Sequence, residues 1–213
     1  CISGINKTCC LKTIRKGTSL DIYGEINING LKTVYPIHLK NENLMDSDDN
    51  YSRQTYMLLA FVDRTTVFIY DQASNNITEC DKNISNHFAD QITYYACSYE
   101  LNGITYILHI SSNYITIFDT KFNVLKKIGT IVSPVIVKYK RKSQMLYIYN
   151  KNNLLIRYNI NNLTNESQIN PEVLSDELLI SAFDVTENLL IYSTWDSNKI
   201  FIYSLNNKKI NQL

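Results

Sequence analysis

The sequence predicts an all-β fold: a partial β-propeller of about four blades, each a four-stranded antiparallel sheet like those of WD-repeat proteins. Short runs rich in β-branched and aromatic residues indicate strands, as at residues 66–71, 114–119 and 199–204. Helical periodicity is nearly absent, and the best helical candidate, residues 171–179, is too short to matter. A group of three or four strands recurs roughly every 40–45 residues, which is the period of a propeller blade.

The strands are expected in a fixed order within each blade, from an inner strand to a middle and an outer one. The expected inner strands lie near residues 31–39, 91–99, 132–139 and 178–185. The expected middle strands lie near residues 55–62, 103–110, 145–150 and 188–194, and the outer ones near residues 65–71, 113–119, 153–160 and 199–205. A fourth strand is expected at residues 75–80 and 122–128 and has only weak signals in the other two blades. Because the chain has only 3 Pro and 6 Gly, Asn and Asp are expected to make the turns.

The interval between the first two inner strands is longer than the later ones. It contains residues 41–53, a polar and acidic stretch with few apolar anchors. This composition is typical of a surface loop. We therefore expect an exposed insertion between the inner and middle strands of the first blade.

A β-sandwich or an ordinary barrel is the alternative architecture. Both also have turn signals every 8–12 residues or so, which means that the number of strands does not exclude them. One pattern recurs along the chain, however: an apolar strand, a short polar turn, then an apolar-rich strand that ends in Tyr or Phe followed by Asp or Asn. This recurrence favours the propeller, and the chain is expected to hold part of a ring.

Composition and charge exclude several classes of protein. The 21 Lys+Arg and 20 Asp+Glu leave a net charge of +1, which provides no global field to attract nucleic acid or an anionic membrane. No run approaches the ~18 consecutive apolar residues of a membrane helix, and no signal-peptide pattern is visible. The five cysteines are odd in number, and Cys9 and Cys10 are adjacent, which favours a reducing compartment over a disulfide framework. An intracellular fragment of a longer protein is expected.

No catalytic site, metal site or cofactor site is expected. His38, His87 and His109 lie tens of residues apart, and none accompanies a nucleophile motif. His109 falls inside an expected strand and is predicted to be a core or blade-edge residue. The chain is therefore not expected to be an enzyme, and an unrelated propeller hydrolase is the weakest alternative.

Two charged clusters have ordinary explanations. Asp46, Asp48 and Asp49 are spaced like calcium ligands but lack the Gly turn and the bidentate Glu of the calcium-binding loop. The basic run at residues 138–142 could contact phosphates, but lysines at a strand end also protect sheet edges from pairing. We expect the three aspartates to lie in a solvated loop and the basic run to protect a sheet edge. Any contact of the protein with nucleic acid is expected to be indirect.

Five segments, in order along the chain, resemble the damaged-DNA-binding protein 1 family. The first three are similar to its CSG, LRIIRNG and GIKGLWPL motifs, the fourth to its LVLSFVGQTRVL strand and the fifth to its WTD region. These segments are residues 1–4, 11–17, 29–37, 56–68 and 194–202. The large subunits of splicing factor 3b and of the cleavage and polyadenylation specificity factor share this architecture. The Gly30-Leu31-Lys32 step and the Trp195-Asp196 pair favour the DNA-damage-binding branch.

The resemblance implies a fragment that spans the end of a first propeller and part of a second. Residues 1–30 would be strands linking from the preceding propeller, and residues 31–213 would form the blades. In that family the second propeller docks cullin-4, while the other two propellers hold substrate receptors. The implied function is a non-catalytic adaptor of a cullin-4 RING ubiquitin ligase in protein ubiquitination and the DNA damage response, located in the nucleus and also in the cytoplasm. The alternative is a subunit of an RNA-processing complex of the same superfamily, with nucleic-acid binding.

The candidate partner-binding residues are Trp195, Asp196 and Glu177. Trp195 is the only tryptophan and lies in an expected turn between two strands, so its ring is expected to be partly exposed. Tryptophan is enriched among interface hot spots, and in the resembled family the tryptophan at this place faces cullin. The opposing interpretation is a tryptophan that packs inside a blade. Asp196 and Glu177 would offer charge partners to a cullin helix, although the position that is acidic in the family is Leu179 here.

Overall fold

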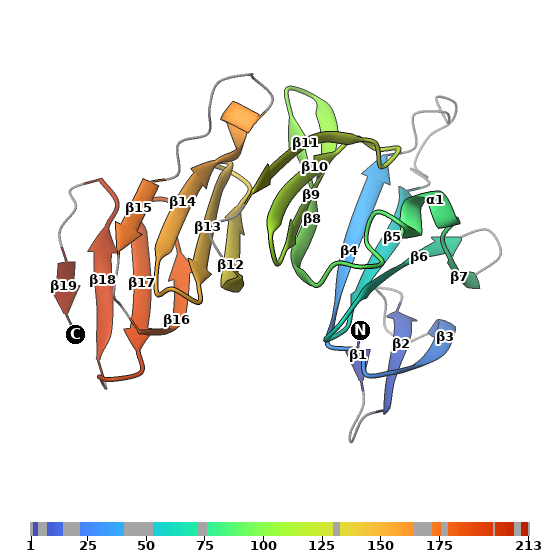
Figure 1. Cartoon of the computed structure of the whole chain (residues 1–213), viewed down its shortest axis with the longest axis horizontal. Helices are drawn as coiled ribbons and strands as arrows, with labels where there is room; N and C mark the ends of the chain where they lie inside the picture. The colour runs from blue at the N-terminus through green and yellow to red at the C-terminus, as the bar shows by residue number, and fades with distance from the viewer. Residues whose placement is uncertain are drawn as a thin grey trace. The chain divides into compact units, whose positions relative to one another are not determined.

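The computed structural model describes residues 2–3, 8–14, 22–40, 53–71, 76–129, 133–163, 172–175, 179–197, 199–206 and 210–212. Within these residues the chain forms five antiparallel sheets (Figure 1). The first sheet has three strands: β1 (Ile2–Ser3), β2 (Thr8–Ile14) and β3 (Ile22–Asn29). The second consists of β4 (Thr33–Lys40), β5 (Arg53–Ala60), β6 (Thr65–Asp71) and β7 (Asn76–Glu79). The third consists of β8 (Thr93–Leu101), β9 (Ile104–Ser111), β10 (Tyr114–Phe118) and β11 (Val124–Gly129).

The last two sheets repeat this arrangement. The fourth consists of β12 (Pro134–Lys140), β13 (Met145–Asn150), β14 (Leu155–Asn159) and β15 (Glu172–Ser175). The fifth consists of β16 (Ile180–Val185), β17 (Leu189–Thr194), β18 (Ile200–Ser204) and β19 (Ile210–Gln212). In every four-stranded sheet the strands follow one another in chain order. The predicted all-β fold of four consecutive four-stranded blades is confirmed.

The fourth strands and the helices differ in part from the expectation. β7 and β11 lie where a fourth strand is predicted, while β15 and β19 complete the blades whose sequence signals are weak. β15 lies inside the segment at residues 171–179 that is the best helical candidate, so that part of the segment is a strand instead. The reason is tertiary: β15 pairs with the buried strand β14, with Arg157 opposite Glu172. In the described part of the chain the helices are α1 (Lys82–Ser85) and the 3₁₀ helix η1 (Ile160–Leu163), each of four residues.

The chain divides into two compact units, Cys1–Ile128 and Gly129–Leu213. In the first unit the core lies between the second and third sheets. Ile37, Leu58 and Val67 of the second sheet pack against a cluster that includes Ile107 and Phe118 of the third. All five side chains are almost completely shielded from solvent. This burial explains why these strands read as continuous apolar runs in the sequence.

Aromatic rings fill the centre of this first core. Phe88, in the connection that follows α1, is fully buried, and its ring lies 5.3 Å from that of Phe118 and 6.0 Å from that of Phe122. Phe122, in the turn between β10 and β11, lies edge-on to Tyr56 of β5 with ring centroids 4.9 Å apart. Residues from two connections and two sheets therefore share one aromatic cluster.

The turn that carries Phe122 is held by Asp119. Its Oδ1 accepts hydrogen bonds from the backbone N–H groups of Lys121 and Asn123, both at 2.8 Å. These bonds allow Phe122 to adopt a φ of 63°, a left-handed backbone that is costly for a bulky residue. The burial of the Phe122 ring offsets the cost of this strained backbone conformation.

Replacing Asp119 with alanine is expected to lower the free energy of unfolding by about 1 kcal/mol, because two backbone N–H groups lose their side-chain acceptor. The measurement is urea unfolding of the variant. Asp119→Asn is the matched control, since its amide oxygen can still accept these bonds. Equal losses in the two variants would contradict this account of the turn.

In the second unit the core lies between the fourth and fifth sheets. Tyr147 and Tyr149 of β13 pack in one cluster with Phe183 and Tyr192 of the fifth sheet. Tyr192 also stacks on Phe201 of β18, with ring centroids 5.1 Å apart. Aromatic side chains from both sheets therefore share one hydrophobic cluster in this unit as well.

The acidic insertion predicted at residues 41–53 lies outside the described residues, except for Arg53, the first residue of β5. Its exposure remains a prediction, as does the solvated character of Asp46, Asp48 and Asp49. The two flanking strands, β4 and β5, pair with each other from Thr33↔Ala60 to Lys40↔Arg53. The stretch therefore connects adjacent antiparallel strands at one end of the blade.

Within the parts of the chain that are described, no helix has the length and apolar character required to cross a membrane.

Candidate partner-docking surface

Trp195 lies in the turn that connects β17 to β18. Along β17 buried and half-buried residues alternate, and Thr194, the last strand residue, is buried. Trp195 then leaves this alternation, and the residue is 77% exposed. The interpretation of Trp195 as a tryptophan packed inside a blade is therefore wrong, and the expected exposure of its ring is confirmed.

Hydrogen bonds hold the backbone of this turn. The N–H of Trp195 donates to the carbonyl oxygen of Leu179 at 2.8 Å. The hydroxyls of Thr194 and Ser197 are hydrogen-bonded to each other at 2.9 Å across the turn. Trp195 thus has an exposed side chain, while hydrogen bonds fix the backbone of its turn.

Leu179 lies beside Trp195 through this backbone contact and is 44% exposed. Asp196, the next residue in the turn, is also exposed. We call these three residues, Leu179, Trp195 and Asp196, the Trp195 surface. Glu177, the third candidate from the sequence, lies outside the described residues. Sequence reasoning missed Leu179 as a surface residue, because an apolar residue next to a strand is ordinarily assigned to the core.

The basic run at residues 138–142 is partly neutralised by acids of the next blade. Lys138 lies 3.6 Å from Asp184, and Lys142 lies 3.5 Å from Glu187. The backbone N–H of Val185 lowers the pKa of Asp184, and the charges of Lys138 and Lys140 lower it further. All four paired side chains are substantially exposed, so these ion pairs contribute little stability.

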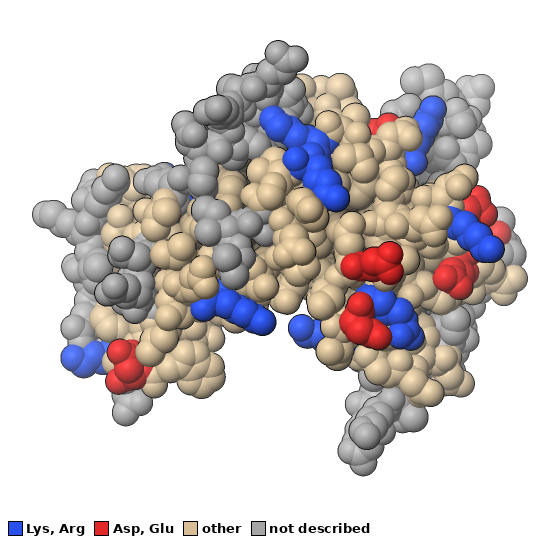
Figure 2. All heavy atoms as spheres, viewed as in Figure 1, with Lys and Arg blue, Asp and Glu red and all other residues tan. Residues whose placement is uncertain are grey.

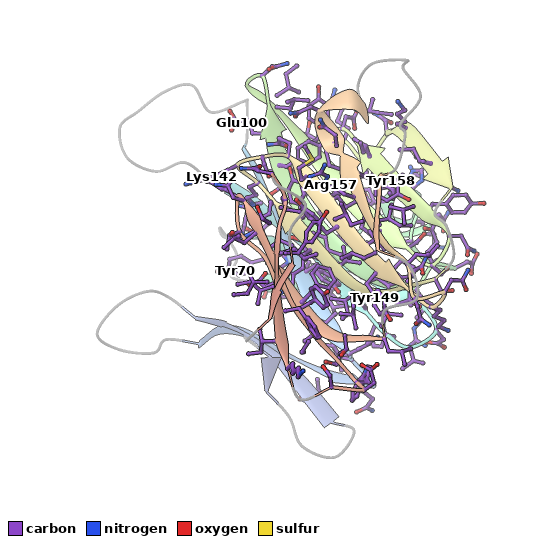
Figure 3. All side chains as sticks on the ribbon, turned by 90° about the vertical axis from the view of Figure 1, so that its left-hand side faces the viewer. Tyr70, Glu100, Lys142, Tyr149, Arg157 and Tyr158 are labelled. Atoms are coloured by element: carbon purple, nitrogen blue, oxygen red, sulfur yellow. The ribbon has the colours of Figure 1, made fainter. Side chains whose placement is uncertain are left out.

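Charge is dispersed over the face of the molecule drawn in Figure 2. Lys and Arg form small separate groups there, with Asp and Glu nearby and uncharged residues between them. Lys142, labelled in Figure 3, is one of the basic residues that face an acid of the next blade. Among the described residues on the face drawn in Figure 2, the basic side chains therefore do not form a continuous stripe.

The three histidines occupy separate elements. His38 belongs to β4, where its Nδ1 lies 3.1 Å from the hydroxyl of Thr55, and His87 is exposed after α1. His109 of β9 is fully buried, which confirms that it is a core residue. Among the described residues no group of three or more His, Cys, Asp or Glu side chains could hold a metal ion.

His109 ends a buried chain of hydroxyl groups. The Thr65 hydroxyl donates to the carbonyl oxygen of Gln91 at 2.7 Å and lies 2.8 Å from the Thr93 hydroxyl. The Thr93 hydroxyl lies 2.7 Å from Nε2 of His109. Since each hydroxyl has one proton, Thr93 donates to Thr65 and must accept from His109. This order places the imidazole proton on Nε2 and leaves Nδ1 deprotonated.

The surroundings of His109 oppose a positive charge. The ring of Phe88 lies edge-on to the imidazole, with centroids 4.9 Å apart. Within the described part of the chain Nδ1 has no hydrogen-bond partner. Burial lowers the pKa of His109 from its usual 6.5 to about 3. A histidine with this pKa is a poor proton carrier near neutral pH, so its role is structural.

The Cys80 thiol is also unsuited to nucleophilic chemistry. Burial raises the pKa of the Cys80 thiol to about 12, and the charges of Asp81 and Glu79 act in the same direction. Because the thiolate is the reactive form, Cys80 is not an activated nucleophile.

Comparison with known proteins places this geometry in a family. Residues 20–213 match the family model described as the RSE1/DDB1/CPSF1 second beta-propeller. A comparison with curated proteins found no match.

Several solved structures share the fold. Saccharomyces cerevisiae Sqt1 is similar over 96% of this chain and 55% of its own, with a TM-score of 0.60 and 10% identity. The β-propeller domain of Cps50 (Swd1) from Myceliophteria thermophila is similar over 74% and 56%, with a TM-score of 0.54 and 14% identity. AztD from Citrobacter koseri is similar over 99% and 57%, with a TM-score of 0.54 and 10% identity. The chain thus spans little more than half the length of these structures, and identities this low establish the fold alone.

Strand order, blade period and the match over residues 20–213 agree with one another. The chain therefore belongs to the RSE1/DDB1/CPSF1 second β-propeller family.

Proposed function

We propose that this chain docks cullin-4 through the Trp195 surface, as part of a non-catalytic adaptor in a cullin-4 RING ubiquitin ligase. A scaffold role is the general property that membership in this propeller family supports. The single observation that carries the specific proposal is the 77% exposure of the only tryptophan in the chain. Leaving a large aromatic side chain in water forgoes its burial energy, and such residues are enriched at the centres of protein interfaces.

The surroundings of Trp195 are suited to a protein partner. Leu179 enlarges the apolar area, while Asp196 adds an acidic side chain that can pair with a basic residue of the partner. Interfaces typically combine an apolar centre with a polar rim in this way. Glu177, two residues before Leu179 in the sequence, is proposed as a second acid of the rim.

The proposed domain organisation, partners and cellular location are those implied by the DNA-damage-binding branch of the family. Residues 1–30 are proposed to link from a preceding propeller, and substrate receptors are proposed to bind other propellers of the full-length protein. The proposed setting is protein ubiquitination in the DNA damage response, in the nucleus and the cytoplasm. No cofactor, metal or small-molecule substrate is part of the proposal.

Replacing Trp195 with alanine is expected to weaken binding of purified cullin-4 by about thirtyfold, because truncating a hot-spot aromatic costs roughly 2 kcal/mol. Thermal stability should stay within about 0.5 kcal/mol of the parent, since the side chain is mostly exposed. The measurements are calorimetric titration and thermal unfolding. Val62→Ala is the matched control, because Val62 is 76% exposed in the corresponding turn of another blade, between β5 and β6.

Unchanged cullin-4 affinity in the stable Trp195→Ala variant would end the cullin-4 proposal. The competing function is that of a subunit in a splicing factor 3b complex or a cleavage and polyadenylation complex. The family description names three branches together and therefore supports this alternative as much as the cullin-4 adaptor. Titration with purified subunits of those complexes and with RNA distinguishes it, because only this alternative expects binding there and none to cullin-4.

A further inference from the structure

We propose that Tyr149, a buried residue of the neighbouring blade, is a positioning residue for the Trp195 surface. This inference rests on the proposed function insofar as the positioned tryptophan serves in docking. The placement of the Trp195 backbone by Tyr149 can be tested without any partner.

The hydroxyl of Tyr149 bridges two blades of the second unit. Tyr149 belongs to β13 and is only 4% exposed (Figure 3). Its hydroxyl accepts a hydrogen bond from the backbone N–H of Ile180, the first residue of β16, at 3.1 Å. It donates to the side-chain oxygen of Asn153, in the turn after β13, at 2.9 Å. The hydroxyl is thus both donor and acceptor, with its geometry set from two sides.

Asn153, which accepts the hydrogen bond from Tyr149, lies in a turn that is itself held by hydrogen bonds. Asn153 has a φ of 61°, and its N–H donates to the carbonyl oxygen of Asn150. The side-chain oxygen of Asn150 accepts the backbone N–H groups of Asn152 and Leu154, both at 3.0 Å. The turn therefore presents the Asn153 oxygen to Tyr149 in a defined place.

The link to Trp195 passes through a single peptide group. The N–H of Ile180 and the carbonyl of Leu179 belong to the same peptide bond, which is planar and trans. Tyr149 holds the N–H end of this plane, and the carbonyl end accepts the N–H of Trp195 at 2.8 Å. Rotation of the plane would disturb both hydrogen bonds together, so Tyr149 constrains the orientation of the carbonyl that holds Trp195.

The three hydrogen bonds that connect Trp195 to Asn153 all point in the same direction. The Trp195 N–H donates to the peptide carbonyl, the peptide N–H donates to Tyr149, and Tyr149 donates to Asn153. Aligned bonds polarise and strengthen one another in a buried setting. A docking residue held before the partner arrives loses less conformational freedom on binding, which increases affinity. The function of Tyr149 is therefore preorganisation of Trp195.

The fluorescence of Trp195 provides the direct test, because the chain has no other tryptophan. In the full chain, Tyr149→Phe is expected to lower the tryptophan fluorescence anisotropy and to weaken cullin-4 binding by about threefold to tenfold. Tyr139→Phe is the matched control. It also removes a tyrosine hydroxyl that has a side-chain acceptor, but Tyr139 belongs to β12, and its acceptor, Gln144, lies in the turn between β12 and β13. A purely general loss of stability would affect both variants alike.

A second variant guards against a Tyr149→Phe chain that does not fold. Asn153→Gly removes the acceptor of the Tyr149 hydroxyl and tolerates the positive φ at this position. It is expected to lower the anisotropy in the same direction. Normal anisotropy in a folded Tyr149→Phe or Asn153→Gly variant would overturn the inference.

The readouts separate this inference from the proposed function. Lower anisotropy with unchanged cullin-4 affinity, while Trp195→Ala still weakens binding, would overturn the role of Tyr149 in docking. If Trp195→Ala has no effect on cullin-4 binding, the proposed function fails. A fall in anisotropy would then still support the positioning of Trp195 by Tyr149.

Discussion

Replacing Phe88 with alanine is expected to lower the free energy of unfolding by about 3–5 kcal/mol, the range for a fully buried phenylalanine. Phe88 is completely shielded, and its ring touches the cluster formed by Phe118, Phe122 and His109. Alanine would leave a cavity between the second and third sheets. Neighbouring strands are tied by backbone hydrogen bonds and can close such a cavity only in part.

Chemical denaturation of the full chain measures this loss. Phe68→Ala is the comparison, because Phe68 of β6 is only half-buried and should lose less stability. Phe88→Leu should recover much of the stability, since it refills most of the volume. A loss in Phe88→Ala no greater than in Phe68→Ala would show that Phe88 is not central to the core.

Acidification is expected to destabilise the chain through His109 by about 1.4 kcal/mol for each pH unit below 6.5. The unfolded chain binds a proton at this histidine with the usual pKa of 6.5, whereas burial lowers the pKa of the folded state to about 3. Between these values the unfolded state holds more protons, so stability is fully present above pH 6.5 and falls as the pH drops. At pH 5 the loss relative to pH 7 is roughly 2 kcal/mol.

The measurement is the pH dependence of the unfolding free energy between pH 7 and pH 4 or so. His109→Gln removes the titrating ring, so its unfolding free energy should fall less steeply with acid than that of the parent, even if its stability at pH 7 is lower. His87→Gln, at the exposed histidine, controls for the loss of a histidine elsewhere. Parallel pH curves for the parent and His109→Gln would refute a buried neutral His109.

The strand pattern was accessible from local sequence. Residues 145–150, predicted as a middle strand, coincide with β13 (Met145–Asn150), and the other inner, middle and outer strands lie within a few residues of their expected positions. The reason is that side chains alternate between the faces of a strand, and blades packed on both faces leave apolar runs between polar turns. β15 was not predicted, because a four-residue strand has too little periodicity to be distinguished from a short helix.

The candidate surface was accessible only in part. A tryptophan placed between two strands predicts an exposed turn residue, and Trp195 is one. Leu179 was not identified as part of the surface, because its contact with the turn is a backbone hydrogen bond to Trp195, and such bonds do not depend on side-chain identity.

The all-β class, the blade period and the exposed position of Trp195 thus follow from periodicity and turn residues, which are properties of short segments. Tertiary structure alone decided that Phe88 fills the core, that Thr65 and Thr93 orient His109, and that Tyr149 reaches the peptide before Trp195. These contacts join residues far apart in the chain: the hydroxyl of Tyr149 and the N–H of Ile180 are separated by 31 positions. Such pairs depend on how one blade packs on the next, and local sequence patterns contain no information about that packing.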